Sequence, residues 1–162
     1  MIDLFLSLLK GLPSELIVLI VSAIPVIEVR GAVPVALLYF KLPVIPTIAL
    51  NIVGSILPVF PLLWFLKYMT GWLRKNKTFD RFFEWLFRRT RAKSKLIEDF
   101  ELIGLALFIG VPLPGTGVWT GTIAAYLLDL PWIPTFLAAT AGTAIATLLV
   151  TAASLGIIKF IL

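Results

Sequence analysis

The charged residues of this 162-residue chain are very unevenly distributed, and this limits the folds open to it. Residues 67–101 hold 15 of the 23 charged side chains, whereas residues 16–66 hold three and residues 102–162 hold two. Only 14% of all residues are charged, against about 25% in soluble globular domains, and 60% are hydrophobic. Apolar tracts of this length exclude a water-soluble globule. They predict an all-α polytopic membrane protein.

The charged segment is basic and periodic. It carries ten positive and five negative residues, an excess equal to the net charge of +5 of the whole chain. Loops rich in Lys and Arg stay on the cytoplasmic side, so we expect residues 67–101 to be cytoplasmic. Large apolar residues recur at helical spacing from Trp72 to Leu86, which predicts an amphipathic helix on the inner leaflet. The basic charge therefore indicates contact with anionic lipid and not with nucleic acid.

Several kinds of chemistry are excluded by composition. The chain has no cysteine and no histidine, which excludes disulfides, thiol chemistry and the usual zinc sites. We expect no metal, no cofactor and no enzymatic reaction, because Glu28 is the one acid expected at membrane depth. The first residues lack a basic region and a small-residue cleavage site, so we expect no cleaved signal peptide.

An acid and a base, Glu28 and Arg30, interrupt the apolar tract of residues 24–47. Residues that disfavour helix flank this pair, and we expect them to deny the backbone a regular helix here. They are Pro25, Gly31 and Pro34.

The apolar run before this interruption is too short to cross a bilayer. Residues 16–24 number nine, and spanning takes about 20 helical residues. Two arrangements of residues 14–41 remain open. They form either one kinked helix across the bilayer or a re-entrant hairpin of two half-helices that enters and leaves on the same face. The prolines, the glycine and the two charges favour the hairpin.

The second half of the chain repeats a motif of the first half. Leu42–Thr47 returns 88 positions later as Leu130–Thr135, with five of six residues identical. The same offset aligns Gly54-Ser55 with Gly142-Thr143, and it sets the region of Glu28 beside the glycine-rich stretch that follows residue 111.

We therefore predict one membrane domain over residues 1–162 that contains two copies of one unit. Repeat 1 covers about residues 14–66 and repeat 2 about residues 102–162, with the charged segment between them. Each repeat is a re-entrant helical hairpin followed by a transmembrane helix, and the two insert in opposite orientations, as in many secondary transporters. Because one short chain has few helices to enclose a path, we expect a homodimer whose interface uses the face of Gly142.

Glu28 and Arg30 are the first candidates for a functional site. A charge in mid-bilayer costs at least ~2.5 kcal/mol, so such residues usually face a protein interior or a water cavity and mark ion or proton pathways. Burial favours the protonated form of Glu28, whereas Arg30 favours the ionised form. Glu28 is therefore predicted to carry a proton, with Gly31 and Pro34 completing this part of the site. The alternative is a structural ion pair that holds the hairpin tip.

The second candidate is the glycine-rich stretch from Pro112 to Gly121. Its glycines allow backbone N–H groups to point into a concavity at the start of the next helix, which together with Arg30 suits a carboxylate or phosphate. In the alternative, the glycines only provide space for packing. Asn51 is a further polar candidate, although such residues more often join helices. The predicted site residues of this stretch are Pro112, Pro114, Gly115, Thr116, Gly117 and Thr120.

The two motifs together resemble a known family. Glu28-Val-Arg-Gly-Ala-Val-Pro34 followed by Pro112-Leu-Pro-Gly-Thr-Gly-Val-Trp-Thr-Gly121 is similar to the small multidrug export protein family, a distant member of the DedA/VTT superfamily of membrane proteins. The similarity spans nearly the whole chain. It implies two re-entrant hairpins in an inverted repeat, dimers, and proton-dependent transport or lipid translocation.

We therefore expect a proton-coupled secondary transporter or exporter of small amphipathic or anionic substrates in the cell membrane. Two other functions remain open. One is passive lipid scrambling or flipping of the DedA/VTT type, and the other is a membrane scaffold that acts through the basic amphipathic helix. The expected partners are membrane lipids, a small-molecule or lipid substrate and a second copy of the chain.

Overall fold

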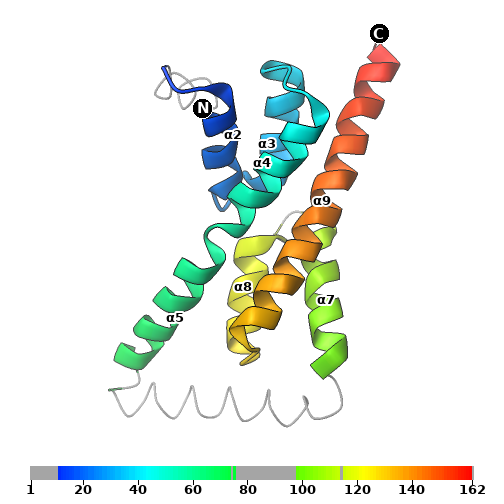
Figure 1. Ribbon diagram of the computed structural model, residues 1–162. Helices are drawn as coiled ribbons and strands as arrows, with labels where there is room; N and C mark the ends of the chain where they lie inside the picture. The colour runs from blue at the N-terminus through cyan, green and yellow to red at the C-terminus, as the bar shows by residue number, and fades with distance from the viewer. Residues whose placement is uncertain (1–10, 74, 76–97, 114, 162) are drawn as a thin grey trace.

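The computed structural model describes residues 11–73, 75, 98–113 and 115–161. Within these ranges every regular element is a helix, as the sequence predicts (Figure 1). The predicted amphipathic helix falls mainly on residues 76–97, which lie outside the described residues, as does Pro114. The elements are α2 (Ser14–Ala23), α3 (Glu28–Pro34), the π-helix η1 (Val35–Tyr39), α4 (Val44–Ile56), α5 (Val59–Leu73), α7 (Glu98–Gly110), α8 (Val118–Leu127) and α9 (Trp132–Ile161).

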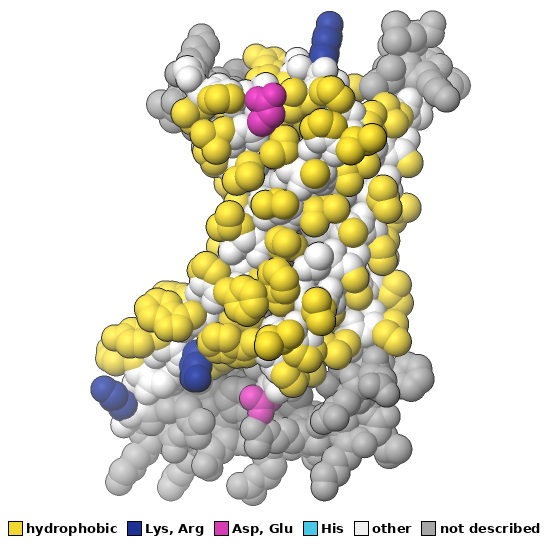
Figure 2. Space-filling view, in the orientation of Figure 1, with side chains coloured by type: hydrophobic (Ala, Val, Ile, Leu, Met, Phe, Trp, Pro, Cys, Tyr) yellow, Lys and Arg dark blue, Asp and Glu magenta, His cyan; other side chains and the backbone are white. Residues whose placement is uncertain are grey.

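Two helical stretches are long and apolar enough to cross a membrane. Val44–Trp72, formed by α4 and α5, has 29 residues and a hydropathy of 2.0 over its most apolar window. Trp132–Gly156, within α9, has 25 residues and a corresponding value of 1.8. Figure 2 shows hydrophobic side chains over the middle of the visible face, with charged side chains near its two ends. These features are those of a membrane protein.

A break at Leu57–Pro58 divides the first of these stretches into α4 and α5. Pro58 has no N–H to continue the helical ladder, so the chain bends there, and α5 leans away from the other helices (Figure 1). Pro61 lies in the first turn of α5, where a helix has no partner for its N–H groups. It therefore fits without a further break.

Residues 14–41 form two short helices and not one kinked rod. The chain turns after α2, and α3 with η1 returns beside it (Figure 1). Ile17 and Val21 of α2 are buried in one cluster with Ala32 of α3. In the structure this part of the chain therefore has the shape of a hairpin, whose turn is formed by residues 24–27.

The prediction that the residues around Glu28 deny the backbone a regular helix is wrong for Gly31 and Pro34. It holds for the turn of residues 24–27, which contains Pro25, and for Glu28 itself, whose φ is 44°. Gly31 and Pro34 both lie within the α-helix that begins at Glu28. The helix continues past Pro34 because its ladder widens into the π-helix η1, in which the N–H of Phe40 donates to the carbonyl of Val35 at 3.0 Å. The irregular segment is instead the turn that precedes Glu28.

Helices α7 and α8 form a second hairpin. An irregular segment begins after Gly110, and α8 starts at Val118. Gly121 of α8 lies directly against the side chain of Ile109 of α7. This hairpin lies at the opposite end of the molecule from α2 and α3, and α9 runs opposite to α4 and α5 (Figure 1).

The second helix of each hairpin packs against the long helix of the other half. Val33 of α3 is buried in one cluster with Ala146 of α9. Ala125 of α8 is buried in one cluster with Leu63 of α5. The two halves of the chain are therefore joined through their cores.

The loops that lead into α4 and α9 share backbone features at positions 88 residues apart. Lys41 and Asp129 have positive φ angles of 54° and 57°, a left-handed conformation that is uncommon for residues other than glycine. Pro43 and Pro131 follow, and each carbonyl accepts a hydrogen bond from the N–H four residues further on, at 3.1 and 3.0 Å. The repeated sequence motif therefore adopts the same local structure twice.

Gly54 and Gly142, also 88 residues apart, let neighbouring helices approach closely. A Cβ on Gly54 would overlap the carbonyl oxygen of Leu19 in α2. A Cβ on Gly142 would lie 2.5 Å from the carbonyl oxygen of Ala106 in α7. The expected use of the Gly142 face as a dimer interface is wrong, because α7 of the same chain covers it.

Gly142→Ala is expected to destabilise the protein by about 1–3 kcal/mol, because the added methyl group overpacks the contact between α9 and α7. Gly104→Ala is the matched control, since no atom lies within 4 Å of the Cβ it would add. It should raise stability by up to about 1 kcal/mol, because alanine is the better helix former. Thermal unfolding in detergent, followed by circular dichroism, measures both. Equal stability of the two variants would contradict the close helix contact.

Candidate functional site

The tips of the two hairpins meet near the middle of the molecule (Figure 1). They carry the two motifs that the sequence analysis selected, one from Glu28 to Pro34 and one from Pro112 to Gly121. Hydrogen bonds that Glu28 accepts and Arg30 donates join the first tip to the second. Segments about 90 residues apart in the chain therefore form one site.

The carboxylate of Glu28 lies at the N-terminus of α8. Its side chain is only 5% exposed, and Oε1 accepts a hydrogen bond from the backbone N–H of Trp119 at 3.3 Å. The unpaired N–H groups of a first helical turn favour a negative charge at this place. The sequence analysis expected a substrate anion there, whereas the structure places a carboxylate of the chain itself at that helix end.

Gly117 makes this contact possible. Its φ of 146° lies in the region that favours glycine, and a Cβ at this position would overlap the carboxylate of Glu28. Glu28 itself has a φ of 44°, a left-handed conformation that costs about 1–2 kcal/mol for a residue other than glycine. Strained backbone therefore occurs where the hairpins touch, a common feature of functional sites.

Arg30 bonds to the second hairpin independently of Glu28. Its Nη2 donates to the carbonyl oxygen of Thr116 and to the Thr116 hydroxyl, the latter at 2.9 Å. Within the described residues, no ion pair joins Glu28 to Arg30, so the tip is held by contacts to the other hairpin. Nε of Arg30 is buried and has no hydrogen-bond partner. Arg30 therefore retains a donor that an anion could use.

The hydroxyls of Thr116 and Thr120, predicted to contact substrate, are engaged in local structure. Oγ1 of Thr116 has one proton, which it can donate to the carbonyl of Val111 or to that of Leu113, at 2.7 and 2.8 Å. Oγ1 of Thr120 donates to the carbonyl of Gly117 at 3.2 Å. These bonds hold the glycine-rich segment in place.

A cavity of about 440 Å³ lies between the tips. Pockets for small molecules measure about 300–1,000 Å³, so this one can hold a small organic molecule. It combines one acid and one base with apolar surface. The described residues contain no group of three or more acidic, histidine or cysteine side chains that could hold a metal. The cavity is lined by Pro25, Val26, Glu28, Arg30, Pro112, Gly115, Thr116 and Thr120.

A smaller hollow, with room for about one water molecule, shares Glu28 and Arg30 with this cavity. It is also lined by Ser55 of α4 and Thr143 of α9. Oγ of Ser55 donates to the carbonyl of Ser22 at 3.1 Å, and the Thr143 hydroxyl is buried without a partner. The sequence analysis assigned no role to these two hydroxyls. The signal was present, because the 88-residue offset aligns Ser55 with Thr143.

Trp119 is a further residue that the sequence analysis missed. Besides its backbone contact to Glu28, its indole Nε1 donates to the carbonyl of Ala23, at the end of α2, at 3.1 Å. A tryptophan in an apolar segment is usually an anchor at the membrane interface. Only the contact between the hairpins shows its different role.

Three predicted site residues line neither hollow. Gly31 lies against the side chain of Ile27, and Pro34 is the last residue of α3. Asn51 is fully buried, and its Nδ2 donates to the carbonyl of Thr47 at 2.8 Å within the same helix. Its Oδ1 has no hydrogen-bond partner.

The chain matches a known protein family. Residues 28–149, three quarters of the chain, match the family described as Putative small multi-drug export protein. The matched region begins at Glu28 and includes the glycine-rich segment. The chain belongs to this family. It matches no curated protein and no solved structure. The description of the export family indicates a transporter.

In this export family member, Gly117→Ala is expected to push the Glu28 carboxylate away from α8. The lost hydrogen bond to a charged group should destabilise the protein by about 1.5–3 kcal/mol, in addition to the backbone strain. Gly115→Ala is the matched control, because its φ of +85° is also positive and strains a side chain, but no atom lies within 4 Å of the added Cβ. Thermal unfolding compares the two variants. Equal losses would show that strain alone, and not the contact with Glu28, determines the effect.

Proposed function

We propose that this chain is a proton-coupled exporter of small amphipathic or anionic molecules, with Glu28 as the proton carrier. The main support is the position of its carboxylate. The same group contacts the N-terminus of α8 in the opposite hairpin and lines the cavity of about 440 Å³ beside Arg30. Protonation of one acid would therefore act both on the contact between the hairpins and on the space for a ligand.

Protonation of Glu28 would weaken the contact between the hairpins. The ionised carboxylate accepts the N–H of Trp119 and interacts favourably with the positive end of the α8 dipole. The neutral acid loses the charge-dependent part of both interactions. Deprotonation would draw the tips together and protonation would let them separate, so proton binding shifts the population of the two arrangements.

Arg30 would bind the anionic group of the substrate. Its Nη2 already bonds to Thr116, but its Nε has no partner and its side chain borders the cavity. Pro25 and Val26 line the same cavity and offer apolar surface to the rest of an amphipathic molecule. Substrate on Arg30 and a proton on Glu28 would each change the charge balance of the site, which couples one to the other.

We further infer an inverted repeat of two re-entrant hairpins in a single multi-pass membrane domain, with residues 67–101 on the cytoplasmic side. Equivalent loops and glycines 88 residues apart, and long helices that run in opposite directions, support the repeat. The excess of positive charge in residues 67–101 supports the orientation. A homodimer and kinship with the DedA/VTT superfamily stay predictions.

Glu28→Gln is expected to reduce proton-coupled transport at least about tenfold. The amide side chain has nearly the shape of the acid but cannot take up and release a proton. Proteoliposomes that hold a pH dye, together with a fluorescent amphipathic sulfonate as substrate, measure both fluxes under an imposed pH gradient. Glu15→Gln, an exposed carboxylate in the first turn of α2, is the control and should transport normally.

Wild-type flux in the Glu28→Gln vesicles would rule out Glu28 as the proton carrier. Dithionite bleaching of labelled lipid, without a pH gradient, tests the scrambling alternative in the same vesicles. Lipid flip-flop that does not depend on Glu28, with no proton-coupled flux, would favour a scramblase over the proposed exporter.

Arg30→Gln is expected to raise the KM for the sulfonate about tenfold, in line with the ~1.5–3 kcal/mol of a hydrogen bond to a charged group. An uncharged analogue of the same dye serves as the internal control, because its KM should change little in the same variant. A proportional rise for both dyes would indicate damage to the cavity and not the loss of an anion-binding group.

A further inference from the structure

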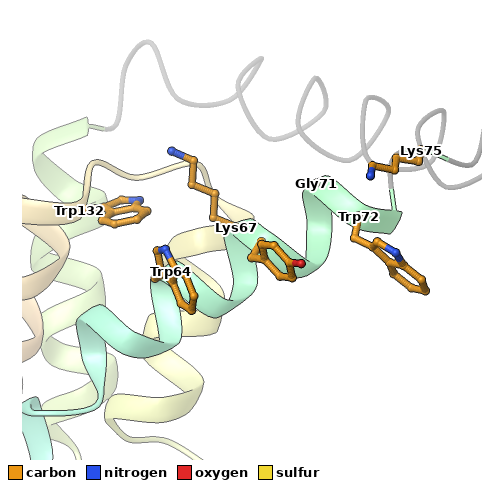
Figure 3. Close-up of a pocket in the computed structure, with 7 residues that line it drawn as sticks. Trp64, Lys67, Gly71, Trp72, Lys75 and Trp132 are labelled. Carbon is orange, nitrogen blue, oxygen red and sulfur yellow. The ribbon is translucent and has the colours of Figure 1, made fainter.

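A second cavity, of about 420 Å³, lies far from the hairpin tips, along the last turns of α5 (Figure 3). Helix α5 leans outward there (Figure 1). Trp132, at the start of α9, lies across from it (Figure 3). We call this cavity the α5 groove. Its lining side chains are four aromatic and two cationic ones, Trp64, Tyr68, Trp72, Trp132, Lys67 and Lys75.

The charge of the α5 groove is of one sign. None of its described lining residues is acidic. Nζ of Lys67 lies 5.4 Å from the ring centroid of Trp132, and Lys75 lies near Trp72 at the other end of the groove (Figure 3). Two ammonium groups among aromatic rings, without a carboxylate between them, favour an anion with attached apolar groups.

The position of the α5 groove indicates where this anion comes from. It lies at the end of Val44–Trp72, a stretch long and apolar enough to cross the membrane, where tryptophan and tyrosine rings typically lie at the level of the lipid headgroups. Trp64, Tyr68 and Trp72 are 64%, 69% and 64% exposed. Exposed rings at this level face lipid, so the ligand would reach them from within the bilayer.

We propose that the α5 groove binds the headgroup of an acidic phospholipid. The phosphodiester lies between Lys67 and Lys75, and the acyl chains extend along the exposed apolar side chains Phe60 and Phe65 of the same helix. A zwitterionic lipid carries its own positive group and so gains less from the two lysines. The proposal does not depend on the proposed transport activity, since it involves neither Glu28 nor Arg30.

Tryptophan quenching by brominated lipids tests this proposal. The full chain is reconstituted in phosphatidylcholine bilayers that contain a minor fraction of either brominated phosphatidylglycerol or brominated phosphatidylcholine. The difference between wild type and Trp64→Phe isolates the signal of Trp64. We expect brominated phosphatidylglycerol to quench that signal more strongly. Each Lys→Gln change at Lys67 and Lys75 should lower the relative affinity about fivefold, and high salt should lower it as well.

Two further variants make the outcome decisive. The double variant Lys67→Arg/Lys75→Arg keeps both positive charges and should keep the preference for phosphatidylglycerol. It therefore shows whether the glutamine variants act through loss of charge or through misfolding. Lys41→Gln removes an exposed lysine between η1 and α4 and should leave the preference unchanged. Equal quenching of wild type by both lipids, or a preference that survives in the double glutamine variant, would overturn the proposal. The proposal would also fail if Lys41→Gln lost the lipid preference as fully as the Lys67 and Lys75 variants do. It would fail as well if neither lipid quenched Trp64 because a second copy of the chain covers it.

Discussion

A carboxylate buried in an apolar molecule needs hydrogen-bond donors, and Glu28 has one at the N-terminus of α8. The first turn of α8 has the complementary need, because its N–H groups have no partner within the helix. Arg30 in turn supplies a hydrogen-bond donor to the carbonyl oxygen of Thr116. The two broken segments therefore satisfy one another, and this allows irregular backbone in the middle of the molecule.

The contacts at the tips differ in kind from those that surround them. Between helices, close approach through Gly54 and Gly142 and the clusters that join α3 to α9 and α8 to α5 depend on shape, and they are insensitive to charge. The tips depend on one titratable group and a few hydrogen bonds. A change in the charge of Glu28 therefore acts on the tips and leaves the packing of the long helices in place.

The fold follows from local signals to a large extent. The start of α8 at Val118, the bend at Pro58 and the matching loops before α4 and α9 all reflect proline, glycine and hydrophobic spacing. The prediction failed at Pro34, where a proline was expected to break the helix. A π-helix absorbs the missing N–H instead, a solution that depends on how α3 packs. Gly142 was correctly noted as a contact residue, but its partner is α7 of the same chain.

The sequence by itself determined the membrane character of the chain, the short motif that recurs 88 residues apart and the pair of motifs that carry its polar groups. Hydrophobicity, charge and helix breaking are properties of single residues and short segments. Only the tertiary structure decided which groups meet. Trp119 lies 91 positions from Glu28, and no local pattern marks it as the donor to that carboxylate. The partners of a buried polar group are determined by distances between helices, and these arise only when the whole chain packs.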